Sequence, residues 1–181
     1  MTLSELINHA LAELEHPADS AGLPLWRDKL TGFANDAIDD LTRTLRPWRR
    51  DPAVLRDGTI DLSTLPHTVS KVLGVERDGR RIPFYYGAST ETLRTKGVKD
   101  GPVDVVYRYL PEPLHAPNDV PQLPPACHAL IVQYMVARFT MHNDAQGQSH
   151  ANMMLSLYEQ RKRRLRMNLD EPEGYSIQNR W

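Results

Sequence analysis

The chemically reactive side chains of this chain are scattered rather than grouped in catalytic motifs. Seven histidines occur, and no two have the spacing of a helical metal-binding motif such as His-Glu-x-x-His. The sequence contains neither a glycine-rich phosphate loop nor a G-x-S-x-G nucleophile elbow. Cys127 is the single cysteine, so an internal disulfide and a multi-cysteine metal site are excluded. We expect no catalytic residue, no metal and no cofactor. A small hydrolase with an unrecognised site is the least favoured alternative.

A dense run of basic residues is the strongest charged feature of the chain. Cations near the end of a helix interact favourably with its dipole, but five like charges in six residues exceed that need. The net charge is −1, so any contact with nucleic acid must come from a local patch. The run suits nucleic-acid phosphates or an acidic protein surface, including another copy of the chain. The residues expected to contact a partner or DNA are Arg161, Lys162, Arg163, Arg164 and Arg166.

Apolar periodicity predicts four helices, the last of which carries the basic run. Thr2 and Glu5 have the spacing of a capping box, and an amphipathic pattern follows to about residue 16. A second helix is predicted from about residue 24 to residue 46, where Pro47 ends it. A third begins at residue 123 and has apolar residues on almost every side, which is typical of a helix surrounded by protein. We expect Cys127 to be a buried small hydrophobe in it. The fourth helix spans about 144–167.

The second helix carries acidic residues on the face opposite its apolar stripe. Asp36, Asp39 and Asp40 could form a solvated face, or an acidic strip between subunits that meets the basic strip of a neighbour.

Between the second and third helices the pattern changes to that of β-strands. Asp57-Gly58 and Asp78-Gly79 each lie between β-prone runs, which predicts two hairpins. Residues 103–110 form the strongest predicted strand, with Val105, Tyr107 and Tyr109 on one face. Residues 87–102 are polar and rich in glycine, serine, threonine and lysine, and we expect a loop there.

The simplest arrangement is a mainly α fold, a four-helix bundle with a small antiparallel β insertion between helices 2 and 3 and an extended C-terminal arm. The bundle would comprise residues 1–47 and 122–167, the insertion 48–121 and the arm 168–181. The arm is either a disordered tail or a docking segment, because a solvating tail gains nothing from Tyr175, Ile177 and Trp181. No long apolar segment or signal peptide is present, so we expect no membrane association and synthesis in the cytoplasm.

The layout of the chain resembles the head-to-tail adaptor (connector) proteins of tailed bacteriophages. The resemblance spans residue 1 to about residue 167 and rests on short motifs. These are Thr2-Leu3-Ser4-Glu5-Leu6-Ile7, a second helix centred on Asn35-Asp36-Ala37, Arg46-Pro47, Leu65-Pro66, Tyr107-Arg108-Tyr109-Leu110-Pro111-Glu112-Pro113 and Leu123-Pro124.

The resemblance implies a structural role in the virion, at the junction of head and tail. Such adaptors form a ring, commonly a dodecamer, beneath the portal protein, and the genomic DNA passes through its channel. Their other partner is a tail or nozzle protein, and their C-terminal segment commonly reaches the portal. The matching portal-docking residues here are Tyr175, Ile177, Arg180 and Trp181. The alternative is a small nucleic-acid-binding protein that uses the basic run 161–166.

Overall fold

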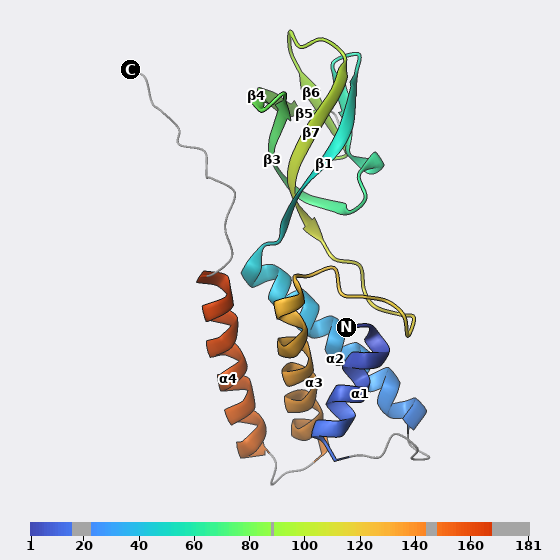
Figure 1. Ribbon diagram of the computed structural model, residues 1–181, viewed down its shortest axis with the longest axis vertical. Helices are drawn as coiled ribbons and strands as arrows, with labels where there is room; N and C mark the ends of the chain where they lie inside the picture. Colours follow the sequence, from blue (N-terminus) through green and yellow to red (C-terminus); the bar gives the residue numbers. More distant parts are fainter. Residues whose placement is uncertain (16–22, 88, 144–147, 168–181) are drawn as a thin grey trace. The chain divides into compact units, whose positions relative to one another are not determined.

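The computed structural model describes residues 1–15, 23–87, 89–143 and 148–167 (Figure 1). The chain forms two compact units, one made of Met1–Leu45 and Pro113–Trp181, the other of Arg46–Glu112. The described part of the first unit is helical, the second is a β-sheet, and each has its own hydrophobic core.

The helical unit contains, among the described residues, four α-helices close to the predicted positions. Thr2 caps the first helix: its hydroxyl accepts from the Glu5 backbone N–H at 3.2 Å, and its own N–H donates to the Glu5 carboxylate at 2.9 Å. A 3-10 turn, Pro125–Cys127, leads into the third helix. The helices are α1 (Leu3–Glu13), α2 (Leu23–Leu45), α3 (His128–Asn143) and α4 (Gln148–Met167).

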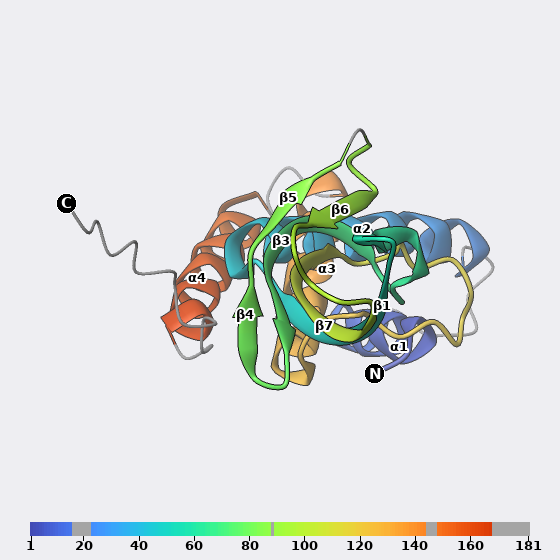
Figure 2. The ribbon, with the colours of Figure 1, turned by 90° about the horizontal axis from the view of Figure 1, so that it is seen from above.

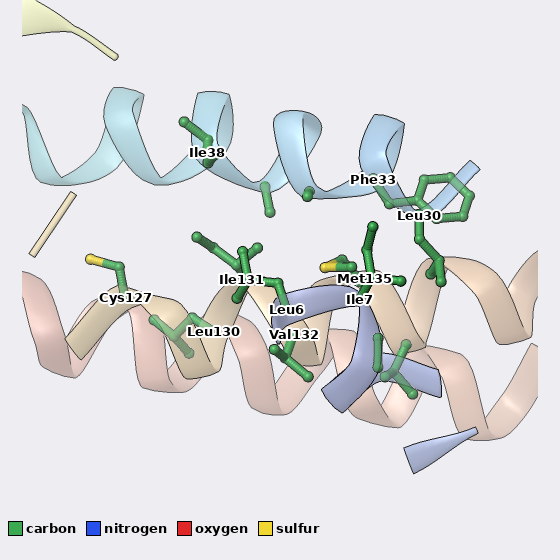
Figure 3. Packing of buried hydrophobic residues seen from close by; sticks show 14 of the residues in the cluster. Leu6, Ile7, Leu30, Phe33, Ile38, Cys127, Leu130, Ile131, Val132 and Met135 are labelled. Atoms are coloured by element: carbon green, nitrogen blue, oxygen red, sulfur yellow. The ribbon is translucent and has the colours of Figure 1, made fainter. Parts of the chain in front are cut away.

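Helix α3 lies at the centre of the helical core, which confirms the prediction from its apolar composition. Ile131 and Met135 are fully buried. Figure 3 shows Ile131 between Ile38 of α2 and Leu6 of α1. Cys127 is also fully buried and belongs to this core, as predicted, and its burial raises the pKa of the thiol to about 11.

The segment that follows the sheet is fixed to α1 and α2 by hydrogen bonds. The Asn35 side chain donates to the Leu114 carbonyl at 3.1 Å and accepts from the Leu114 N–H at 2.8 Å. The N–H of Leu3 donates to the Asp119 carbonyl at 2.8 Å. These bonds hold the chain against the bundle before α3 begins, a role for Asn35 that the sequence did not reveal.

The described residues of the second unit form an antiparallel sheet of seven strands in the order β4-β3-β7-β1-β2-β6-β5. Both predicted hairpins are confirmed, with φ of 49° and 70° at Asp57 and Gly58 and of 51° and 73° at Asp78 and Gly79. The strands are β1 (Trp48–Arg56), β2 (Thr59–Asp61), β3 (Thr68–Arg77), β4 (Arg80–Ile82), β5 (Phe84–Tyr86), β6 (Thr92–Thr95) and β7 (Gly101–Leu110).

The sheet curls around its own apolar core (Figure 2). Val105, Tyr107 and Tyr109 of β7 all belong to this core, so their predicted common face is confirmed. The curl brings β3 and β5 together: the Val72 N–H donates to the Tyr86 hydroxyl at 3.2 Å, although these strands lie near opposite ends of the strand order. The β region is therefore a folded unit with a core of its own.

This sheet overturns the predicted fold class. The chain is not a mainly α four-helix bundle with a small β insertion, because the described residues combine four helices with a nearly closed seven-stranded sheet. Three stretches of strand were missed. The first part of β1 was missed because it contains Pro52, a residue that argues against a strand within a sheet. The strands β5 and β6 were missed because they are too short to show alternation. The expected loop at 87–102 contains β6, which tertiary pairing with β2 and β5 stabilises.

The two hairpin glycines provide a matched pair for a stability test. Both have positive φ, but a Cβ on Gly58 would lie 3.3 Å from the Thr95 carbonyl oxygen, whereas one on Gly79 would meet nothing within 4 Å. Gly79→Ala should lower the free energy of unfolding of the sheet by about 1 kcal/mol through backbone strain alone, and Gly58→Ala by about 2 kcal/mol. Urea unfolding of both variants would measure the difference, and equal losses would show that the contact with Thr95 is unimportant.

Candidate interaction surface

A polar network joins α2 to α4 on one side of the helical unit. The Tyr158 hydroxyl donates to Asp40 Oδ2 at 2.6 Å, and Lys162 Nζ donates to the same oxygen at 2.7 Å. Lys162 also donates to Glu159 at 2.7 Å. The Lys162 side chain is only 7% exposed, so its ammonium group depends on these two carboxylates for compensation.

The network raises the pKa values of Tyr158 and Lys162. Burial, followed by the hydrogen bond to Asp40 and the charge of Asp40, raises the pKa of Tyr158 well above its usual value. Burial alone would lower the pKa of Lys162, but hydrogen bonds to Asp40 and Glu159 outweigh it, so the pKa is raised. The Tyr158 hydroxyl stays protonated and Lys162 stays charged, which suits a structural clamp.

A second contact holds α4 against α3. Gln133 of α3 donates to the Met154 carbonyl at 3.1 Å and accepts from Arg161 at 2.9 Å. Two members of the predicted basic run, Arg161 and Lys162, therefore fix the position of α4 within the chain. The remaining members are exposed, and their side chains make no hydrogen bond or ion pair with another described residue. These are Arg163, Arg164 and Arg166.

The acidic strip predicted on α2 also contains one residue with partners inside the chain and two exposed residues. Asp40 belongs to the polar network, while Asp36 and Asp39 are exposed and make no ion pair with another described residue. They line a groove of about 470 Å³ that is bordered by α2, α3 and α4. Its lining residues are Asp36, Asp39, Asp40, Arg43, Tyr134, Arg138, Leu155, Tyr158 and Glu159. The lining combines four carboxylates with two arginines and two tyrosines, so its charge is mixed and acidic on balance.

The sheet unit has a polar network that the sequence did not reveal. The buried Tyr107 hydroxyl donates to Asp51 at 2.7 Å, and Arg49 lies 3.4 Å from the same carboxylate. Arg49 also contacts His67 at 2.7 Å. Burial, followed by the bond to Asp51, raises the pKa of Tyr107, so its hydroxyl remains a donor. The network links β1, β7 and the turn before β3.

The sequence of the chain matches the family model of the SU10 adaptor protein over residues 1–178. The chain belongs to this family of phage head–tail adaptors. No curated protein sequence matches it. Membership gives the adaptor a structural role in the virion and implies interaction with other head or tail proteins of the phage. Structural adaptors of this kind are typically not enzymes.

Three further points concern metal binding, membrane-spanning helices and the predicted portal-docking residues. Among the described residues, no group of three or more His, Cys, Asp or Glu side chains is placed to hold a metal ion. In the same part of the chain, no helix is both long and apolar enough to cross a membrane. The predicted portal-docking residues Tyr175, Ile177, Arg180 and Trp181 lie outside the described residues.

Proposed function

We propose that the chain is the structural head-to-tail adaptor of a tailed bacteriophage, assembled as a homo-oligomeric ring, a dodecamer, beneath the portal. The ring joins the capsid to a tail or nozzle protein and leaves a channel for the genomic DNA. The family match over residues 1–178 is the observation that carries this proposal.

The charge distribution of the helical unit supports assembly into a ring. Asp36 and Asp39 on α2 and Arg163 and Arg164 on α4 have opposite charges and no ion pair within the described chain. Complementary patches on two different surfaces of one molecule favour head-to-tail association, which closes into a ring when the rotation allows it.

The segment 168–181 is proposed to dock on the portal. Tyr175, Ile177 and Trp181 would supply apolar anchors, and Arg180 a charged contact at the rim. Aromatic anchors of this kind contribute a large share of binding energy in protein interfaces.

The proposal is tested by measuring binding of the chain to the portal protein of the same phage. The full-length chain should bind, and a chain that ends at residue 167 should lose at least ten-fold in affinity. A chain of full length with Tyr175, Ile177 and Trp181 replaced by serine is the matched control, and it should lose affinity to a similar degree. Unchanged binding of both variants would contradict the role of the arm. Absence of portal binding by the full-length chain would contradict the proposed function itself.

A further inference from the structure

An exposed glycine, Gly32, lies in α2. Gly32 is in the helix interior, where glycine is less favourable than any residue except proline. A Cβ at this position would meet nothing within 4 Å, so no neighbour in the described chain requires its small size. Gly32, Asp36, Asp39 and Arg43 follow at i, i+4, i+7 and i+11 and form one exposed stripe along α2. The two aspartates and Arg43 also line the groove bordered by α3 and α4 of the same chain. A glycine in such a stripe permits close approach of a helix from outside.

Helix α4 presents a stripe with complementary properties. Met153 and Leu157 are 55% and 41% exposed, although both are large and apolar. Arg164 continues the same face at i+11 from Met153 and i+7 from Leu157. This outer stripe is opposite the residues that contact α2 and α3, namely Ala151, Tyr158 and Lys162, which are buried. The outer stripe therefore has an apolar centre and a cationic end.

We propose that the outer stripe of α4 (Met153, Leu157 and Arg164) packs on the outer stripe of α2 (Gly32, Asp36 and Asp39) in a second copy of the chain. Leu157 lies over Gly32 and Arg164 pairs with Asp39. Leu157 and Arg164 are seven residues apart in α4, and Gly32 and Asp39 are seven residues apart in α2. Seven residues of helix span about 10.5 Å, so both contacts can form at once. The packing is parallel, since the apolar contact precedes the charged contact in both helices. Arg163, one position before Arg164, points about 100° away around the helix and adds positive charge beside this contact.

The direction of the helices agrees with this parallel packing. Within the helical unit, α2 and α4 run in the same general direction, each opposite to α3 (Figure 1). A copy placed alongside in the same orientation, as in a ring, brings its α2 parallel to the α4 of its neighbour. Because the two stripes are different surfaces, the contact is head-to-tail and can close into a ring. This inference rests on the proposed function and specifies which surfaces meet in the ring.

The proposed interface has a small apolar centre, so two free copies should bind each other weakly. Assembly should therefore require a high concentration of the chain. Two exposed apolar side chains and one or two surface ion pairs contribute little binding energy for a free pair of copies. Copies already held on the portal have a high effective concentration for one another. Loading on the portal should consequently be cooperative, and the number of copies bound per portal is the quantity to measure.

Two charge-reversal variants test the interface. The first carries Arg163→Glu and Arg164→Glu, and the second carries Asp36→Lys and Asp39→Lys. All four side chains are exposed and lie outside the Asp40–Lys162 network, so both variants should keep the thermal stability of the parent. Each variant alone should load at least five-fold fewer copies per portal, counted by native mass spectrometry. A mixture of the two should restore full loading, because each contact then joins opposite charges.

The outcomes separate the interface from the proposed function. If each variant alone loads like the parent chain, or if the mixture fails to restore loading, the two stripes do not meet and the inference is wrong. If the parent chain itself does not load on the portal, the proposed function fails instead. In that case sedimentation of the parent, of each variant and of their mixture at high concentration still tests the interface, since only the parent and the mixture should self-associate. Equal sedimentation of all four samples would overturn the inference.

Substitutions at Gly32 provide a second, independent test. Gly32→Ala should raise the melting temperature of the isolated chain, because alanine favours the helix and its methyl group meets no atom of the chain. Gly32→Leu should also leave the isolated chain folded, but it should reduce the number of copies loaded per portal at least five-fold. Full loading by the folded Gly32→Leu variant would show that no neighbouring helix approaches this position.

Discussion

Ile131→Ala should lower the free energy of unfolding of the helical unit by about 3 kcal/mol. Ile131 is fully buried in α3 and lies between α1 and α2 (Figure 3). Its replacement removes buried methyl groups and leaves a cavity that three helices cannot close by small movements. Denaturant unfolding followed by helical circular dichroism would measure the loss.

The exposed Leu157 is the control for this experiment. Leu157→Ala removes a similar volume from a side chain that is 41% exposed, so it should change the free energy of unfolding by less than about 0.5 kcal/mol. Equal losses for Ile131→Ala and Leu157→Ala would contradict the central position of α3.

Asp40→Ala should lower the free energy of unfolding of the helical unit by about 2 kcal/mol. This is a large loss for a residue at the surface of the unit. The substitution leaves the Lys162 ammonium with Glu159 as its remaining carboxylate and leaves the Tyr158 hydroxyl without its acceptor. The loss is smaller than for a fully buried ion pair, because the Asp40 side chain is 38% exposed. Thermal or denaturant unfolding of the variant would measure it.

The partner substitution shows whether the cost comes from the buried cation. Lys162→Met replaces the ammonium with an apolar side chain of similar length, so the double variant with Asp40→Ala should recover most of the lost stability. If the double variant is as unstable as Asp40→Ala alone, the effect comes from Tyr158 or from α2 itself. A stability for Asp40→Ala equal to that of the parent would show that the network does not hold α4 in place.

Local signals in the sequence predicted the helices and the hairpins. The Thr2–Glu5 capping box and the apolar periodicity located α1, and the Asp-Gly pairs located two turns whose positive φ values those residues tolerate. The predicted fold class failed because strands such as β5 and β6 are defined by their partners rather than by their own residues. Short strands in a polar segment carry little periodicity, so the extent of the sheet could not be predicted.

The polar contacts of α4 were predictable only in part. The basic run lies in α4, in the predicted fourth helix, and its residues point in different directions around that helix. Lys162 follows Tyr158 by four residues and so continues the apolar stripe that contains Ala151, which could have indicated its burial. Its partner Asp40 is 122 positions away, and only the packing of α2 against α4 brings them together.

Electron microscopy of the full-length chain mixed with the portal protein of the same phage tests the central claim most directly. We predict a ring of adaptor copies bound coaxially at one end of the portal, with a continuous channel through both. Portals that remain bare at an excess of folded adaptor chain would contradict the proposed role.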